Sequence, residues 1–442
     1  MRKKTLKSII TIASMLVIST ASFSQTIKEL NVDGFKVYFK PTSKQVISTR
    51  LFVPGGTSNY TGSQQGIEAL ALSVAMNGGT VSKNKTQFKT EAEKIGTSFG
   101  SSSSLDYSQM EMNCIKPFWE KSWDLFADAV MHPAFEANEF VLIKDQMVSD
   151  ARQRESDPDA FLNDTAMSFV FKGRGYERNP NGSASSLERF TPDVTKQYYK
   201  NTITSGKCFL IVVGDLTEDE VISKVKATLA KLPAGTPAKM NANVTITQGT
   251  QNIVERDIAT NYIIGLMTSP SMTSKDGIPM LVAMNIINSH MFVEVRTRRG
   301  LSYSPRSYVN TDAITSPYSA VYATSDSPKK VIEVITEMLN EFKKNGFSQD
   351  ELANKKQEFL TTYLMGLETS ASQSLAIGRW AVRGNVKGFE EFTTKVNAVT
   401  LKDLNRVVDQ NTNAIVWTYL GHKNEIQPVD FKQTTVYQNK PY

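Results

Sequence analysis

The sequence has 442 residues, of which 40% are hydrophobic and 21% are charged. This length exceeds what one hydrophobic core usually supports, and the composition is that of a globular protein, so we expect about two to three folded domains. Four basic and no acidic residues fall in the first 24 positions, and in the rest of the chain basic residues outnumber acidic ones by only two. This near balance argues against a nucleic-acid partner.

Residues 1–24 have the three parts of a secretory signal peptide. The basic segment MRKKTLK precedes the apolar run SIITIASMLVIST, and ASFSQ supplies small residues for cleavage. An uncleaved N-terminal anchor is the alternative, and we expect no later stretch to reach the roughly 20 apolar residues of a membrane span. The sequence therefore predicts an exported protein, which we expect in a bacterial periplasm.

The first half of the remaining chain alternates predicted strands and helices. Residues 46–76 predict a strand, a polar turn and a helix, and residues 97–114 predict two strands joined by a polar turn. The helix, within GIEALALSVAMNGGT, has apolar residues at helical spacing and a Gly-Gly stop. Two further helices follow, then a helix opened by Thr191, and the strand of KCFLIVVGD closes the half.

The second half repeats this order at a distance of roughly 200 residues, which indicates a domain duplication. Thr400 opens the helix that corresponds to the one after Thr191, and a boundary falls near LPAGTPAKMNANVT. We therefore predict an α+β protein of two homologous domains, residues 25–235 and 236–442. Each is expected to be an antiparallel sheet covered by helices on one face.

Cysteine and histidine are scarce. Cys114 and Cys208 lie in strand-like runs, so we expect two buried free thiols, although an exported protein could join them if the fold brought them together. His132, His290 and His422 are far apart in the sequence. A zinc site made from this chain alone would need an unusual ligand set.

Four segments, in order and spacing, resemble the insulinase or pitrilysin family of zinc peptidases, and most closely its shorter mitochondrial-processing-peptidase branch. They are GIEALALSVAMNGGT, FEANEFVLIKDQMVSDARQRESDP, IVVGDLTEDEV and VEVRTRRGLSYS. The resemblance covers residues 27–425. It implies two α+β domains in each subunit, and two subunits or half-molecules that close around an unfolded peptide.

The resemblance also locates a degenerate zinc motif. Family enzymes carry His-x-x-Glu-His on the first helix, where the histidines bind zinc and the glutamate acts as base. The matching residues here are Ala69, Leu72 and Ser73, and the family's third ligand matches Asp150, with Ile143 where a supporting glutamate is often found. We expect core packing for the first two, a solvated helix position for Asp150, and no nucleophilic role for Ser73, which has no base nearby in sequence. The chain is therefore expected to hold no cofactor and to hydrolyse no peptide alone.

The second half keeps a different family feature. Active members have an arginine and a tyrosine in R-x-x-x-G-L-x-Y that reach the substrate at the zinc, and Arg296 and Tyr303 match them. A guanidinium can bind a peptide carbonyl, and a phenol can donate to the oxyanion that forms on water attack. The alternative is an ordinary surface arginine and tyrosine.

The family also uses an edge strand after the first helices to pair with the substrate backbone. The matching segment TSFGSSSSLDYS is rich in small residues, and the resemblance assigns Ser98, Phe99, Gly100 and Ser101 to this substrate strand. A serine-rich hairpin turn is the alternative. Two features depart from many relatives: the chain lacks an asparagine near Gly100, and INSHMF lacks a glycine run before Arg296.

Two hypotheses on function follow. In the first, this chain is the non-catalytic subunit of an exported heteromeric zinc metalloendopeptidase, and it binds unfolded peptide and supplies Arg296 and Tyr303. A homologous partner subunit carrying His-x-x-Glu-His would supply the zinc. The asymmetric loss favours this hypothesis, because the metal site is erased while the complementary pair is kept. The alternative is a non-enzymatic structural or peptide-binding protein of the same fold. A homodimer in the absence of the partner is left open.

Overall fold

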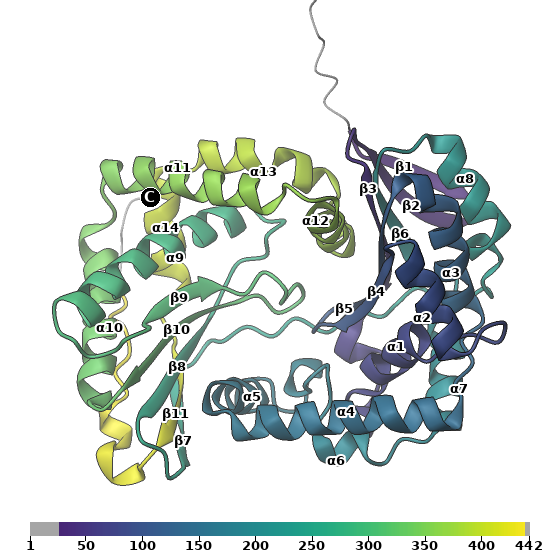
Figure 1. Cartoon of the computed structure of the whole chain (residues 1–442). Coiled ribbons are helices and arrows are strands. Elements are labelled where there is room, and N and C mark those ends of the chain that lie inside the picture. Colours follow the sequence, from purple (N-terminus) through teal and green to yellow (C-terminus); the bar gives the residue numbers. More distant parts are fainter. Residues whose placement is uncertain (1–25, 438–442) are drawn as a thin grey trace, which may run out of the picture.

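The computed structural model describes residues 26–437, so the predicted signal segment lies outside the described residues. Two β-sheets, each accompanied by helices, form two α+β units that lie side by side (Figure 1). The predicted α+β class with one sheet in each half is confirmed.

The first sheet has six strands in the order β1-β2-β6-β3-β5-β4. Its neighbouring strands are antiparallel, as predicted, except for the parallel pair of β2 and β6. The long crossover that parallel pairing requires is supplied by the strands and helices between these two strands. The strands are β1 Lys28–Val32, β2 Phe35–Pro41, β3 Val46–Pro54, β4 Ser98–Ser103, β5 Tyr107–Ile115 and β6 Phe209–Gly214.

The second sheet has five strands in the order β7-β11-β8-β10-β9. It too contains one parallel pair, formed by β7 and β11, so the duplication preserves this departure from a purely antiparallel sheet. The strands are β7 Thr250–Glu255, β8 Asn261–Thr268, β9 Arg306–Val309, β10 Tyr318–Ser325 and β11 Val416–Gly421.

The helices repeat between the halves as the sequence predicts. Thr191 and Thr400 cap the corresponding helices α7 and α14, because their side chains accept hydrogen bonds from the backbone N–H groups of Val194 and Asp403. The first half contains α1 Ile67–Asn77, α2 Lys85–Lys94, α3 Trp119–Met131, α4 Ala137–Ser156, α5 Pro158–Val170, α6 Ala184–Leu187, α7 Pro192–Thr202 and α8 Glu218–Ala227. The second contains α9 Gly277–Met291, α10 Pro328–Asn345, α11 Gln349–Gly366, α12 Ser370–Val382, α13 Lys387–Ala398 and α14 Leu401–Asn411.

One helix of each half packs on the sheet of the other half (Figure 1). Helix α5 packs on β8 and β11, where Leu162 and Ala166 are buried against the second sheet. Helix α12 packs on β3 and β6, and Ile377 is buried among the aromatic and aliphatic side chains of the first sheet. Each sheet thus has helices of its own half on one face, as predicted, and the sequence did not indicate that a helix of the other half covers the opposite face.

A buried carboxylate also joins the halves. Asp106 follows β4 and is completely buried. It accepts hydrogen bonds from the Tyr176 hydroxyl, from the backbone N–H of Ile314 at 2.7 Å, and from the Thr315 hydroxyl at 2.7 Å. Because both sides of the junction contribute donors, the junction is held by a polar network as well as by apolar packing.

One segment departs from the sequence-based expectation on membrane spans. Within the described residues, the helical segment Gly277–Thr297 is long and apolar enough to cross a membrane by length and composition alone. Of its most apolar window, 61% is buried inside the second unit, where Met284 and Ile287 belong to the core. Burial in the core therefore accounts for its apolar composition.

Candidate functional site

Helix α1 occupies the place of the predicted zinc motif. It begins after Gly66, whose φ of +86° suits glycine, and a Cβ atom there would lie 2.6 Å from the Cα of Gly182. Ala69 and Leu72 are 8% and 1% exposed, and Ser73 is half-buried. The side chains at these three positions thus belong to a packed helix.

The described residues do not fit a zinc ion. Asp150 is exposed on α4, where its carboxylate accepts a hydrogen bond of 2.8 Å from Gln146 Nε2. A methyl group, an isobutyl group and a lone hydroxyl on α1 offer no set of ligands to complement that carboxylate. Among residues 26–437, no group of three or more His, Cys, Asp and Glu side chains could hold a metal ion. Cys114 and Cys208 are buried and free, as predicted, and burial raises the pKa of Cys208 to about 12.

Helix α1 carries one buried carboxylate that the sequence reasoning missed. Glu68 is 1% exposed and accepts hydrogen bonds from Ser108 Oγ at 2.5 Å, Tyr198 Oη at 2.6 Å and Asn59 Nδ2 at 2.9 Å. Burial raises the pKa of Glu68, and the three hydrogen bonds oppose that effect. Its place in the first helical turn suggests only a favourable dipole interaction at the surface, so no sequence signal could have indicated burial.

The predicted substrate strand is the edge strand β4. Of the strands between residues 26 and 437 it pairs with β5 alone, and α1 packs against it. Phe99 contacts Phe88 with ring centroids 5.1 Å apart, on the side of the sheet that faces the helices. Gly100 lies on the opposite face, directly across from Glu111 of β5. The structure thus places Ser98 to Ser101 in an extended strand with a free edge, and not in a hairpin turn.

Arg296 and Tyr303 lie together in the second unit. Arg296 belongs to the π-helical turn Phe292–Thr297, which continues α9. Gly300, with a φ of +63°, ends this turn, and the Leu301 N–H donates to the carbonyl of Val295 at 2.9 Å. The chain then turns back, so that the Tyr303 ring centroid lies 4.2 Å from Arg296 Cζ.

Among the described residues, the Arg296 guanidinium has aromatic contacts and no polar ones. The Phe292 ring centroid lies 4.8 Å from its Cζ, so two rings hold the guanidinium. The neighbouring Arg298 and Arg299 both form 2.5 Å ion pairs with Glu294. Within residues 26–437, the Arg296 side chain has no hydrogen bond or ion pair, and its donors are available to a ligand. We refer to Phe292, Arg296 and Tyr303 as the arginine clamp.

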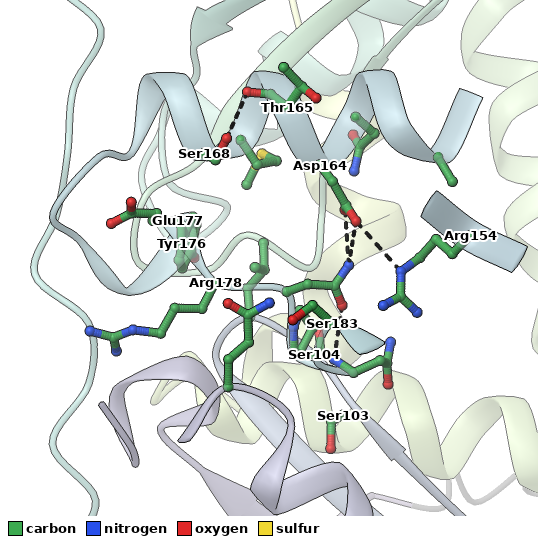
Figure 2. Close-up of a pocket in the computed structure, with 18 of the residues that line it drawn as sticks. Ser103, Ser104, Arg154, Asp164, Thr165, Ser168, Tyr176, Glu177, Arg178 and Ser183 are labelled. Carbon is green, nitrogen blue, oxygen red and sulfur yellow. Dashed lines mark hydrogen bonds and ion pairs between the residues drawn. The ribbon is translucent and has the colours of Figure 1, made fainter. Parts of the chain in front are cut away.

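A cavity of about 870 Å³ opens at the end of β4, between α5 and the turn that follows it (Figure 2). Asn179 Nδ2 donates to both oxygens of Asp164 at 2.9 Å. Arg154 Nε lies 3.5 Å from the same carboxylate (Figure 2). Arg178 donates to the backbone carbonyls of Thr57 and Tyr60. Burial raises the pKa of Asp164. Asp164 is held by Arg154 and Asn179, and Arg178 is held by backbone carbonyls, so these side chains form a fixed polar wall.

Comparison with known proteins identifies the family. Residues 36–180 match the family model of insulinase, peptidase family M16, and residues 189–359 match the model described as the peptidase M16 inactive domain. The two matches together span most of the chain. The chain belongs to the insulinase family.

Relatives differ in their described activity. The non-peptidase homolog YmxG of Helicobacter pylori is 20% identical over 380 residues, which cover 84% of this chain and 88% of the relative. The uncharacterized zinc protease YmxG of Bacillus subtilis is 21% identical over 339 residues, which cover 75% and 82%. The crystal structure of a peptidase M16 inactive domain from Pseudomonas fluorescens shares the fold, with a TM-score of 0.82 and 19% identity, over 91% of this chain and 99% of that one. This insulinase-family chain is one that lacks the zinc motif.

Proposed function

We propose that this chain is the zinc-less subunit of an exported, heteromeric insulinase-family metallopeptidase. In this proposal it binds unfolded peptide and supplies Arg296 and Tyr303 to the zinc site of a partner. The observation that carries the proposal is the arginine clamp, in which a guanidinium is held by two rings while its polar donors stay unpaired. The partner is a homologous subunit with His-x-x-Glu-His, and the zinc is expected there.

The clamp suits a role across an interface. Phe292 is 47% exposed and Tyr303 is 76% exposed, so both rings lie at the surface. A planar guanidinium fixed by aromatic faces loses little further freedom when it binds a peptide carbonyl. The Tyr303 hydroxyl can donate to the oxygen that becomes negatively charged during hydrolysis. Both groups would complete a site whose water-activating part lies on another chain.

The family relationships support the non-catalytic part of the proposal. One relative is described as a non-peptidase homolog, and the match over residues 189–359 is to an inactive domain. In this chain, Ala69 and Leu72 are buried apolar residues at two of the three motif positions. A chain with such a helix can contribute to peptide hydrolysis only through binding or through residues elsewhere.

The test is reconstitution with a homologous chain that carries the intact zinc motif. Cleavage of an unfolded fluorogenic peptide and zinc per complex are measured for the mixture and for each chain alone. We expect cleavage only from the mixture, and we expect Arg296→Ala combined with Tyr303→Phe to lower kcat/KM by about 100-fold. Arg298→Ala is the matched control, because that arginine is exposed and paired with Glu294. Full activity of the double variant would show that the proposed role is wrong.

The free edge of β4 favours a second candidate, a peptide-binding protein with no enzymatic context. Binding of unfolded peptide by this chain alone, with no cleavage in any mixture with homologous chains, would favour that candidate. Sedimentation of the isolated chain would show whether it forms a homodimer without a partner.

A further inference from the structure

We propose that Glu111 gives the peptide-binding strand β4 a preference for a basic side chain, Lys or Arg, at the peptide position that lies beside Gly100. This inference rests on the proposed binding of peptide to the edge of β4, and it names the kind of peptide that binds there.

The geometry around Gly100 carries the inference. Gly100 and Glu111 face each other in the register of β4 and β5, and a Cβ atom on Gly100 would lie 3.0 Å from Glu111 Oε1. The Glu111 carboxylate therefore lies over the glycine and extends toward the free edge of the sheet. The backbone of Gly100 does not need glycine, since its φ is not positive. The absence of a side chain there leaves room for the carboxylate.

The Glu111 carboxylate retains capacity to accept hydrogen bonds. Arg50 on β3 contacts its Oε2 from the side away from the edge, and the Arg50 side chain is 7% exposed. Arg50 also donates to Ser374 Oγ at 2.8 Å, so α12 helps to hold it in place. A carboxylate can accept about four hydrogen bonds, and among the described residues Oε1 has no hydrogen-bond partner. With 29% of its side chain exposed, Glu111 can be reached from solvent.

A peptide added to β4 would direct alternate side chains to this face of the sheet. Strands lie about 4.8 Å apart, so such a side chain must cross the whole width of β4 to meet a residue of β5. Ser98 and Ser102 flank Gly100 on the same face and are small. A long side chain with a terminal donor can follow this path, whereas an acidic side chain would meet the carboxylate with like charge.

The test measures the binding of unfolded host peptides by fluorescence anisotropy. Each peptide carries one Lys, Gln or Glu, moved along the sequence one position at a time. For the full chain we expect Lys peptides to bind about 10-fold more tightly than their Glu counterparts, as for a hydrogen bond to a charged group. In one binding register the preference should appear at the single position beside Gly100, and the two adjacent positions, which face the other side of the sheet, should show none.

Two variants separate Glu111 from general effects on the strand. Glu111→Gln keeps the shape and removes the charge, and Gly100→Ala keeps the Arg50 pair but places a methyl group against the carboxylate. Both should bring the ratio of Kd values for Glu and Lys peptides close to one. Glu93→Gln, an equal charge change on the exposed side of α2, should leave that ratio unchanged.

The outcomes distinguish this inference from the proposed function. If the chain binds peptides but shows no preference for Lys, or if the preference survives in both variants, the role of Glu111 is wrong and peptide binding stands. If no peptide binds to the chain or to its complex, the proposed peptide binding itself fails, and this inference fails with it.

Discussion

At the scale of single residues, the arginine clamp distinguishes one arginine among three close neighbours. The resemblance to R-x-x-x-G-L-x-Y singled out Arg296 and Tyr303, and the structure shows that the turn at Gly300 brings the two side chains together. The sequence could not show that Glu294 neutralises the other two arginines, or that Phe292 forms the second wall, since both depend on the π-helical turn. The resemblance named the pair, and the structure shows that, of these three arginines, Arg296 is the one whose side chain has no ion pair among residues 26–437.

The arginine clamp predicts that replacing Phe292 lowers activity only when the aromatic ring is lost. Phe292→Leu should release Arg296 from one aromatic contact, which is worth about 0.5–1 kcal/mol at an exposed site, and lower kcat/KM of the reconstituted complex several-fold. NMR of the Arg296 side chain should show a smaller ring-current shift in this variant. Phe292→Tyr, which keeps a ring, should retain both properties. Equal loss in the two variants would contradict the clamp.

The buried Glu68 predicts a pH-dependent stability. Its folded-state pKa is raised by burial, so the folded protein binds this proton more tightly than the unfolded chain does. The stabilisation is fully present below the ordinary glutamate pKa and is lost as the pH rises through the folded-state value. Urea unfolding is measured for the wild type and for Glu68→Gln, from below the ordinary glutamate pKa to above the folded-state pKa of Glu68. As the pH rises, the free energy of unfolding of the wild type should fall relative to that of the variant. Parallel curves would show that Glu68 titrates normally.

At the scale of elements, the sequence predicted the kind and order of the helices and strands better than their partners. Thr191 and Thr400 were sufficient to mark two helix starts, because capping is a local interaction. The helix that is now α5 was predicted as one of two that follow the first sheet's hairpin, but a local pattern cannot tell which sheet covers it. The parallel pair β2 and β6 and the turn Phe292–Thr297 were also missed, since both arise from contacts or hydrogen bonds that no local pattern specifies.

The left-handed turn at Gly300 predicts a separable effect on stability and function. Gly300→Ala meets no atom within 4 Å, so its cost is the strain of a φ of +63°, about 1 kcal/mol of unfolding free energy. Gly96→Ala is the matched control, with a φ of +61° and equally open space. Chemical denaturation should show similar losses for both, while only Gly300→Ala should lower cleavage by the reconstituted complex. Equal activity of the two variants would show that the return of Tyr303 does not matter.

At the scale of the whole molecule, the exchange of α5 and α12 joins two units that the sequence presented as separate domains. The duplication was readable because each half repeats the same order of elements. The junction between the units could not be predicted from the sequence, because Asp106 lies in a short polar turn and its partners Ile314 and Thr315 are more than 200 residues away. A buried network between distant segments leaves no signal in a single sequence.

The Asp106 network predicts the strength of the junction. Asp106→Asn replaces an acceptor that several donors share, and should cost about 3 kcal/mol of unfolding free energy. Calorimetry should show a lower Tm and a broader or divided transition, because the two units become less tightly coupled. Asp215→Asn, at a partly exposed ion pair with Lys116, should change the free energy by less than about 1 kcal/mol. A single transition of unchanged Tm in Asp106→Asn would contradict this account.

The exchanged helices restrict how the molecule can move. Separating the two units would pull Ile377 off the first sheet and Leu162 off the second at the same moment, and would expose apolar surface on both sheets to water. Hinge opening between the two units therefore costs free energy, and the chain should move as one rigid body. In the proposed complex, a chamber that admits and releases peptides would then open where this chain meets its partner. Access would be controlled by the affinity between subunits, and not by flexibility inside either one.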